Sequence, residues 1–459
     1  MNVAIVGCGY VGLVTGVCLA AEGHNVHAVD TDRARTDLIA RGQAPFYEPG
    51  LEELLRTAIG AGHFAVGTDL SAAIRKADVI MLAVGTPSID GIADLTALES
   101  ALQSVGSELA ASKQIQTVVI KSTVVPTTCD TFALPILERA SGKLAGAGFG
   151  LAMNPEFLRE GHAVEDFRNP DRIVIGALDE PSAVAVENLY ETYECPKLRT
   201  TLRNAEMIKY ASNALLALLI SFSNEIAGMC ESIAGVDAGI VMDGLHLDRR
   251  LSPMVDGRRI EPQILTYLRP GVGFGGSCLP KDVAALLSFA RSHGAPAHML
   301  EAVLDVNARR PQRIVEMIRS ELGSLHDKRI VLLGLAFKPG TDDLRDSPAL
   351  RIAGLLLQEG AQVSAVDPFA DRFPSTSINQ HIRTSTHPEG LLVDADAAVV
   401  VTAWPDFRQW DWAALLQSMR APVLFDGRNA LRDVQLPESA RYIPIGRASA
   451  PLQEGSRIG

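Results

Sequence analysis

The first thirty residues follow the order strand, glycine-rich turn, helix, strand and acid, and this order restricts the fold more than any other feature of the chain. Residues 3–6 are an apolar run, residues 7–12 read Gly-Cys-Gly-Tyr-Val-Gly, and a second apolar run at residues 26–29 ends in Asp30. Glycines at this spacing allow a tight turn and let a pyrophosphate approach the N-terminus of the next helix. The pattern predicts a dinucleotide-binding α/β domain; a glycine-rich turn without a ligand is the alternative.

Asp30 indicates which dinucleotide this domain binds. A carboxylate at this position accepts hydrogen bonds from the adenosine ribose and repels the 2′-phosphate that distinguishes NADP from NAD. Arg35 stands close by in the sequence and keeps NADP open. We expect NAD as the cofactor. Its predicted contacts in this segment are Gly7, Gly9, Tyr10, Val11, Gly12, Asp30 and Arg35.

A second stretch, residues 270–282, places a cysteine at the start of a predicted helix. Four glycines precede Cys278, and apolar residues then recur at helical spacing. The N-terminus of a helix favours the thiolate form of a cysteine. Ser277 is a candidate N-cap, and Asp282 lies four residues after the cysteine on the same helical face. This is typical of a cysteine nucleophile with an acid–base neighbour, although a structural loop around a small buried cysteine has the same composition.

Composition and charge exclude several classes of protein. A chain of 459 residues is too long for one core, and a net charge of −12 leaves no basic surface for nucleic acid or anionic lipid. The six cysteines show no C-x-x-C spacing, so we expect no metal site and a reducing compartment. Residues 1–6 carry no basic region, and the most apolar run, residues 214–220, is too short to span a bilayer. We expect a cytoplasmic protein without a membrane segment.

Other strands of the first domain also end in polar residues. Apolar runs at residues 79–84 and 118–120 are followed by Thr86 and Thr123. Small hydroxyl residues at the carboxyl end of a strand are where open parallel sheets bind ligands. A strand at residues 150–153 leads into Asn-Pro-Glu-Phe-Leu-Arg-Glu-Gly, whose two carboxylates also fit a solvated helix start.

One long helix is predicted over residues 203–233. Lys209 and Asn213 are four residues apart in it and therefore face the same way. A fixed positive charge and an amide donor can stabilise an oxyanion, whereas the alternative is a polar seam satisfied inside a helical interface. A long, mostly apolar helix between domains is also a candidate dimer interface.

The last third of the chain repeats the order strand, glycine-bearing loop, helix, strand and acid. It begins with a strand at residues 329–333, but its loop lacks Gly-x-Gly-x-x-Gly and carries Lys338 and Arg345 instead, which suits another phosphate-bearing ligand. We expect an α/β protein with two Rossmann-like doubly wound domains, joined by a long central helix and a helical middle domain. The predicted divisions are residues 1–200, 201–305 and 306–459, with a frayed tail from about residue 448.

The order of these motifs resembles the UDP-glucose/GDP-mannose dehydrogenase family over nearly the whole chain. The motifs are Gly-Cys-Gly-Tyr-Val-Gly, Val-Gly-Thr-Pro, Lys-Ser-Thr-Val, Asn-Pro-Glu-Phe-Leu-Arg-Glu-Gly, Lys-Tyr-Ala-Ser-Asn-Ala, Phe-Gly-Gly-Ser-Cys-Leu-Pro-Lys-Asp and Gly-Leu-Ala-Phe-Lys-Pro-Gly-Thr-Asp-Asp-Leu-Arg. The resemblance implies that NAD oxidises the 6-hydroxyl of a nucleotide sugar twice, giving the uronic acid. Cys278 would add to the bound aldehyde, because an aldehyde gives up a hydride readily only after a nucleophile has made it tetrahedral.

The resemblance also implies roles for the other candidate residues. Lys209 and Asn213 would hold the alkoxide and oxyanion, Asp282 would orient or deprotonate water, and Glu156 with Thr123 would position a water and act as acid and base. The implied cofactor contacts outside the glycine turn are Thr86, Thr123, Glu160 and Arg345. The implied substrate contacts are Phe157, Leu158, Glu160, Lys209, Asn213, Arg259, Tyr267, Arg269, Phe274, Gly275 and Lys338. A homodimer or higher homo-oligomer is expected.

The nature of the sugar nucleotide rests on finer features. Residues 209–214 resemble the UDP-glucose type more closely, whereas residues 267–271 resemble the GDP-mannose branch. Residues 248–267 form a longer segment than the resemblance to the UDP-glucose type leads us to expect. We expect UDP-glucose as the substrate, with GDP-mannose as the alternative. Asn-Pro-Glu-Phe in place of a Ser-Pro-Glu-Arg type motif argues against N-acetylhexosamine relatives. A single-step β-hydroxyacid-type dehydrogenase and a non-catalytic sugar-nucleotide sensor are the other hypotheses.

Overall fold

The computed structural model describes residues 1–89, 91–374 and 380–448. It divides into two compact units: unit 1 is Met1–Ser212 with Ala284–Gly294, and unit 2 is Asn213–Val283 with Ala295–Gly459. The predicted tail lies almost wholly outside the described residues. The division into three domains made from the sequence remains a prediction.

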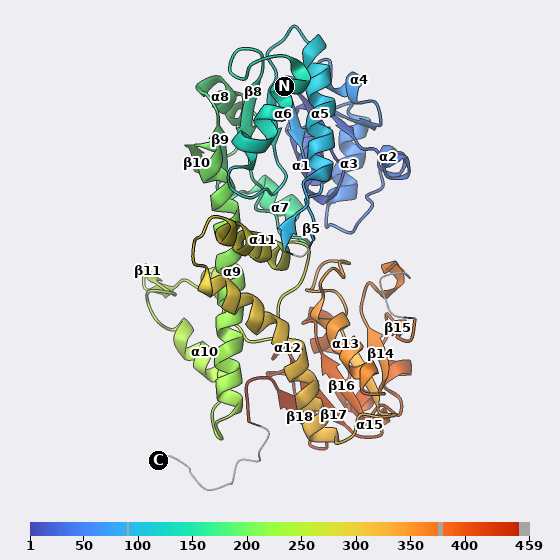
Figure 1. Cartoon of the computed structure of the whole chain (residues 1–459). Helices are drawn as coiled ribbons and strands as arrows, with labels where there is room; N and C mark the ends of the chain where they lie inside the picture. The colour runs from blue at the N-terminus through green and yellow to red at the C-terminus, as the bar shows by residue number, and fades with distance from the viewer. Residues whose placement is uncertain (90, 375–379, 449–459) are drawn as a thin grey trace. The chain divides into compact units, whose positions relative to one another are not determined.

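Unit 1 contains an eight-stranded sheet in the order β10-β9-β8-β7-β4-β1-β2-β3 (Figure 1). Its strands are β1 (Asn2–Val6), β2 (Asn25–Val29), β3 (Phe64–Gly67), β4 (Val79–Leu82), β7 (Thr117–Ile120), β8 (Gly150–Met153), β9 (Ile173–Ala177) and β10 (Lys197–Thr200). All neighbours are parallel except β8 and β9. The central strands are apolar throughout because both faces of a parallel sheet are covered by helices.

Two hydrophobic cores lie on the two faces of this sheet. One contains buried side chains of α1 (Tyr10–Ala21), α2 (Arg33–Ala40), α3 (Leu51–Gly60), α7 (Ala163–Arg168) and α8 (Glu180–Asn188). The other contains those of α4 (Leu70–Ile74), α5 (Thr96–Ala111) and α6 (Leu134–Ser141). The sheet is therefore doubly wound, as the sequence predicts.

The glycine turn lies where the strand order reverses, between β1 and β4. Gly7 has a φ of +99°, and a Cβ there would lie 2.8 Å from the carbonyl oxygen of Ala83. A Cβ on Gly12 would lie 1.9 Å from the carbonyl oxygen of Gly7. Neither position tolerates a side chain, which is the local reason for the glycine spacing.

Four helices occupy the middle of the chain: α9 (Leu202–Glu231), α10 (Ala238–His246), α11 (Leu279–Ser292) and α12 (His298–Leu322). The boundary between the units falls inside α9 and again inside α11. By length and composition α9 could cross a membrane, but the core helix of a globular protein meets the same criterion. Short hairpins are formed by β5 (Ser88–Ile89) with β6 (Ile92–Ala93) and by β11 (Met254–Val255) with β12 (Arg258–Arg259).

Unit 2 contains a six-stranded, wholly parallel sheet in the order β15-β14-β13-β16-β17-β18. Its strands are β13 (Arg329–Leu333), β14 (Gln362–Val366), β15 (Arg383–Ser385), β16 (Ala397–Val400), β17 (Val423–Asp426) and β18 (Arg441–Pro444). Buried residues of α12 and α13 (Pro348–Gln358) belong to one core, and those of α14 (Glu389–Leu392) and α15 (Trp412–Ser418) to another. The predicted second Rossmann-like fold is confirmed.

The acid at the end of β14 differs from its counterpart Asp30. Asp367 has no exposed surface and accepts hydrogen bonds from the backbone N–H groups of Leu335 (2.7 Å) and Ala336 (3.0 Å) and from the indole of Trp404 (3.2 Å). Burial raises the pKa of this carboxyl, and the donors only partly oppose that effect. The second domain thus repeats the order of elements of the first. Its acid, however, accepts hydrogen bonds from groups of its own domain.

Candidate active site

A buried ion pair links the segment after β8 to α9 in unit 1. Lys209 Nζ lies 2.8 Å from Glu156 Oε1, and their side chains are 3% and 5% exposed. Glu156 Oε2 also accepts from the backbone N–H of Leu158 at 2.6 Å. Burial by itself would raise the pKa of Glu156, but Lys209, the Leu158 N–H and the charge of Lys121 together lower it. Glu156 is therefore held as a carboxylate, and a solvated helix start is the wrong interpretation of residues 154–161.

Lys121 is a second buried lysine beside this pair, and sequence reasoning missed it. Its Nζ donates to Asn154 Oδ1 at 2.8 Å and lies 3.4 Å from the hydroxyl of Tyr190, which itself donates to Asn154 Oδ1 at 2.6 Å. Burial lowers the pKa of Lys121 to about 7, with Glu156 and Lys209 acting in opposite directions. Its place directly after β7, beside Thr123, was the available signal, because ligand residues gather at that edge of a parallel sheet.

The predicted hydroxyl residues lie together at the carboxyl edge of the sheet. Thr86 follows β4, Thr123 follows β7, and Thr86 Oγ1 donates to the carbonyl oxygen of Thr123 at 2.7 Å. Glu160, the second carboxylate of residues 154–161, is buried. Beside Glu156, the ring of Phe157 lies under Arg172, whose guanidinium carbon is 4.0 Å from the ring centroid.

The residues of the glycine turn fit a dinucleotide. Asp30 Oδ2 accepts from the backbone N–H of Cys8 at 2.7 Å and pairs with Arg35 at 3.1 Å. Burial would raise the pKa of Asp30, but the backbone N–H groups of Asp32 and Cys8, together with Arg35, lower it. An ionised acid at the end of β2, next to a turn that excludes Cβ atoms, is what the ribose and pyrophosphate of NAD require.

The hydroxyl of Tyr10 is hydrogen-bonded to another part of the chain. It donates to the buried carboxylate of Glu48, which also accepts from the backbone N–H groups of Gly161 and Ala163, each at 2.7 Å. Tyr10 thereby ties the start of α1 to the end of residues 154–161. Contacts of Tyr10 and Val11 with the cofactor stay predictions.

In unit 2 the cysteine directly precedes α11. The helix begins at Leu279, so Cys278, and not Ser277, occupies the position before the first helical residue. Cys278 is a partly exposed thiol that forms no disulfide, with Sγ 3.4 Å from Ser277 Oγ. The backbone N–H of Asp282 donates to the carbonyl oxygen of Cys278 at 2.9 Å, which is the first turn of the helix.

Asn213 of α9 and Asp282 of α11 are in direct contact. Asn213 Nδ2 donates to Asp282 Oδ2 at 2.6 Å, and Lys281 Nζ pairs with the other carboxylate oxygen. Asp282 is almost fully buried. It therefore holds the amide of Asn213 in one orientation beside the first turn of the helix that follows Cys278.

The predicted substrate contacts next to the cysteine lie in a closely packed loop. Phe274 is buried, and a Cβ on Gly275 would lie 2.3 Å from the carbonyl oxygen of Asp346. The backbone N–H of Gly276 donates to the carbonyl oxygen of Arg345 at 2.9 Å, while the Arg345 guanidinium pairs with Asp343 at 2.8 Å. The ammonium of Lys338 lies 5.6 Å from the ring centroid of Phe337. Arg345 thus reaches the cysteine loop through its backbone.

The arginines before the cysteine loop are held by α10 and by the segment that follows it. Arg259 Nη1 donates to the carbonyl oxygens of Leu247 (2.9 Å) and Ser252 (3.0 Å). Arg269, which follows the short 3-10 turn that ends at Tyr267, pairs with Asp243 of α10.

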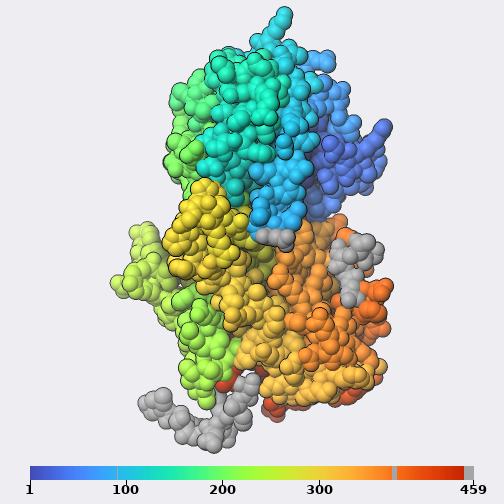
Figure 2. All heavy atoms as spheres, in the orientation of Figure 1, coloured from blue at the N-terminus to red at the C-terminus, as the bar shows by residue number. Residues whose placement is uncertain are grey.

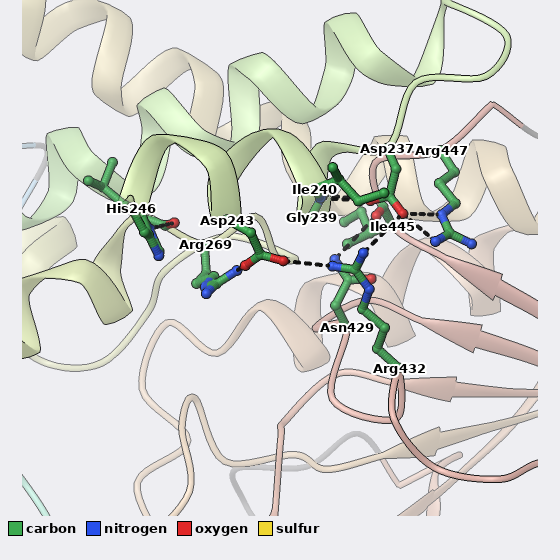
Figure 3. Close-up of polar contacts among 11 residues, drawn as sticks. Asp237, Gly239, Ile240, Asp243, His246, Arg269, Asn429, Arg432, Ile445 and Arg447 are labelled. Atoms are coloured by element: carbon green, nitrogen blue, oxygen red, sulfur yellow. Dashed lines mark hydrogen bonds and ion pairs between the residues drawn. The ribbon is translucent and has the colours of Figure 1, made fainter. Parts of the chain in front are cut away.

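Figure 3 shows the ion pairs that continue from Arg269 across unit 2. Asp243 is shared between Arg269 and Arg432, whose Nη1 lies 3.4 Å from it. Arg432 and Arg447 also pair with Asp237, the N-cap of α10. These pairs attach α10 to the segments after β17 and β18.

A guanidinium at the edge of the second sheet was not predicted. Arg428 follows β17 by two residues, and its Nε donates to the carbonyl oxygen of Val401, after β16, at 2.7 Å. A Cβ on Gly271 would lie 2.7 Å from its Nη1. Burial lowers the pKa of Arg428 to about 10, so it remains a cation at the ligand edge of this sheet.

Comparison with known families covers almost the whole chain. The NAD binding domain of the UDP-glucose/GDP-mannose dehydrogenase family matches residues 1–194, its central domain residues 203–309, and its UDP binding domain residues 331–433. A dinucleotide turn in one Rossmann-like fold and a UDP binding domain in the other define an NAD-dependent dehydrogenase of nucleotide sugars. The chain belongs to the UDP-glucose/GDP-mannose dehydrogenase family.

Individual relatives agree with this assignment. The chain is 38% identical to UDP-glucose 6-dehydrogenase TuaD of Bacillus subtilis, over 99% of this chain and 95% of the relative. It is 42% identical to a GDP-mannose 6-dehydrogenase of Pseudomonas putida, over 80% of this chain and 81% of the relative. Among solved structures, a UDP-glucose dehydrogenase of Pyrobaculum islandicum is similar with a TM-score of 0.87 and 37% identity, covering 97% of this chain and 98% of that one. The predicted family, fold and cofactor are confirmed.

Proposed function

We propose that this protein oxidises the 6-hydroxyl of UDP-glucose to the carboxylate of UDP-glucuronate. One observation carries the proposal: the continuous helix α9 bears Lys209, which is paired with Glu156, and one turn later Asn213, which is bonded to Asp282 at the start of the cysteine helix. The match to UDP-glucose 6-dehydrogenases extends over nearly the full length, which favours UDP-glucose over GDP-mannose.

The first oxidation needs a base and a stabilised oxygen. The glycine turn and Asp30 would hold NAD, which would supply the hydride acceptor for both steps. Glu156, held as a carboxylate, takes the proton of the 6-hydroxyl through a water that Thr123 positions. Lys209 and Asn213 donate to the sugar oxygen as it becomes an alkoxide and then the carbonyl of an aldehyde.

The second oxidation needs the cysteine. Cys278 Sγ forms a bond to carbon 6 of the aldehyde, which gives a thiohemiacetal, and loss of the second hydride converts it to a thioester. Water, oriented by Asp282, then attacks the thioester carbon and the sulfur leaves. Over both steps one alcohol, two NAD⁺ and one water give one carboxylate, two NADH and three protons.

The test is the amount of NADH formed per nucleotide sugar. UDP-glucose should yield two NADH and the acid, in a panel that also contains GDP-mannose, UDP-galactose and UDP-N-acetylhexosamines. Cys278→Ala should abolish acid formation. Two NADH per sugar from Cys278→Ala would exclude this mechanism. One NADH per sugar from the unaltered protein would favour a single-step type of site that needs only a lysine. No NADH with any nucleotide hexose would favour a sugar-nucleotide sensor.

We also propose a homodimer formed through α9. Leu215, Phe222 and Met229 recur at seven-residue spacing on this helix and are 49%, 43% and 53% exposed. Side chains at this spacing share one side of a helix, and an exposed apolar stripe of this length suits a self-complementary interface. The β11–β12 hairpin, which carries exposed Met254 and Val255, projects from the surface of its unit (Figure 2).

We propose a cytoplasmic location because the cysteines require a reducing compartment. None of the six cysteines, all within the described residues, forms a disulfide, and Cys278 has to stay reduced to act as a nucleophile.

A further inference from the structure

The loop that carries the cysteine is held by a side chain that the mechanism does not use. Asn307 of α12 is only 7% exposed. Its Oδ1 accepts from the backbone N–H of Phe274 at 2.7 Å, and its Nδ2 donates to the carbonyl oxygen of Phe274 at 3.0 Å. The amide thus satisfies both backbone groups of one residue, as a neighbouring strand would. Asn and Gln side chains present a donor and an acceptor side by side without a charge, which this contact requires.

The loop is shaped to admit this amide. Gly273 has a φ of +105°, and a Cβ there would lie 2.7 Å from Asn307 Oδ1. On its other side the loop is limited by Asp346, whose carbonyl oxygen would lie 2.3 Å from a Cβ on Gly275. Two glycines therefore allow the loop to pass between α12 and residues 345–346. With so little free space, the position of Phe274 is set by the partners on either side.

A second buried amide holds the start of the same loop. Asn224 of α9 accepts from the backbone N–H of Gly271 through Oδ1 at 2.7 Å, and Arg310 Nε donates to the carbonyl oxygen of Gly271 at 2.8 Å. Glu231 in turn accepts from Arg310 Nη2 at 3.3 Å. Within the described residues, Nδ2 of Asn224 has no hydrogen-bond partner. Asn224 therefore uses only its acceptor, whereas Asn307 uses its acceptor and its donor.

We infer that Asn307 is the positioning residue of the second oxidation, because its amide fixes the backbone from which Cys278 is presented four residues later. The inference rests on the proposed function. Carbon–sulfur bond formation depends on the placement of Sγ within about 0.5 Å, whereas the first hydride transfer makes no use of the sulfur. Loosening the loop at Phe274 should therefore slow the second step more than the first.

The test separates the two steps at saturating substrate. Asn307→Asp keeps the acceptor for the Phe274 N–H but places an oxygen against the Phe274 carbonyl oxygen. The ratio of the second to the first rate should fall roughly 10- to 100-fold, the scale of a lost orientation. NADH per UDP-glucose should then fall from two toward one, and hydroxylamine should trap the released aldehyde. A general loss of stability would lower both rates together and leave the yield at two NADH per UDP-glucose.

Two further variants make the result specific. Asn224→Asp introduces a carboxylate at the other buried amide that contacts the loop. The carboxylate keeps the one hydrogen bond that Asn224 accepts, so this variant should still give two NADH per UDP-glucose. The methyl group of Gly273→Ala would lie too close to Asn307 Oδ1 and displace the amide from the loop. This variant should therefore show the same fall in NADH per UDP-glucose as Asn307→Asp. If circular dichroism shows that Asn307→Asp does not fold, Gly273→Ala decides the matter.

The inference and the proposed function fail differently. Two NADH per sugar and no trapped aldehyde in both Asn307→Asp and Gly273→Ala would overturn the role of Asn307 and leave the proposed function intact. A lowered ratio in Asn224→Asp as well would show that any disturbance of the loop has this effect, which also overturns the specific role. Absence of NADH formation by the unaltered protein would instead remove the proposed function.

Discussion

Lys209 Nζ lies 2.8 Å from Glu156 Oε1 in a place where both side chains are almost completely shielded from water. Removal of one partner leaves an uncompensated buried charge. Lys209→Met should therefore lower the free energy of unfolding by about 3–5 kcal/mol, while the double variant Lys209→Met/Glu156→Gln should recover most of that loss. Urea unfolding measures the free energy of unfolding of the single and of the double variant. An unchanged urea midpoint for Lys209→Met would contradict the buried pair.

Lys121 should make the stability of the protein depend on pH. Its pKa lies near 7 in the folded chain and at the ordinary value of 10.5 in the unfolded chain, so between these values the unfolded chain binds the extra proton. The free energy of unfolding contributed by this group therefore rises with pH over that window. Lys121→Met should stabilise the protein most at pH 7 and below, with a gain that shrinks as the pH approaches 10.

Urea unfolding at pH 6.5 and 9.5 tests this dependence. The groups that act on Lys121 are Asn154 and Tyr190 by contact and Glu156 and Lys209 by charge. Lys121→Arg is the matched control, because a guanidinium keeps its proton throughout this range and should show no such slope. A gain from Lys121→Met that is equal at both pH values would show that Lys121 keeps its charge when buried.

Asp30 should determine the choice between NAD and NADP. Asp30→Asn removes the negative charge that repels a 2′-phosphate and that Arg35 faces at 3.1 Å. The ratio of kcat/KM for NAD to that for NADP should fall roughly tenfold, which corresponds to the loss of one charged hydrogen bond. The control is Asp32→Asn, because Asp32 also faces Arg35 but caps α2, a position that asparagine fills equally well. A preference for NAD that survives Asp30→Asn would assign discrimination to another residue.

The α9 stripe should control the oligomeric state. Phe222→Glu puts a charge in the middle of the exposed apolar stripe and should convert a dimer into a species with the 49.0 kDa mass of one chain. Light scattering after size-exclusion chromatography measures this mass. Val184→Glu makes the same change at an exposed apolar residue of α8 in unit 1 and should leave the mass unaltered. A monomeric unaltered protein would remove the proposal.

The sheets could be predicted closely because their strands are continuous apolar runs. Residues 150–153 and 329–333 form strands with the predicted bounds, since strands buried on both faces are predominantly apolar. The start of the cysteine helix was predicted one residue early. Helix ends depend on a single cap, which is the least certain part of any sequence pattern.

The site was predictable where its chemistry is carried by a local motif. Cys278, Asp282 and the glycine turn belong to such motifs. Glu156 was ambiguous because its burial depends on Lys209, more than fifty residues away in the sequence. The only local signal of Lys121 is its place directly after β7, and Asn307 has none, because what distinguishes both residues is the set of groups brought against them by folding.

The carboxylate of Asp367 bears on how many cofactor molecules one chain can take up. Four donors from its own lobe, the backbone N–H groups of Leu335, Ala336 and Phe369 and the indole of Trp404, already occupy the oxygens that a ribose would need. The sheet of unit 2 therefore cannot bind an adenine dinucleotide at Asp367, even though its first strand, loop, helix and second strand follow the same order as those of unit 1. Titration calorimetry should give a stoichiometry of one NAD per polypeptide, a number that a count of Rossmann-like lobes would put at two.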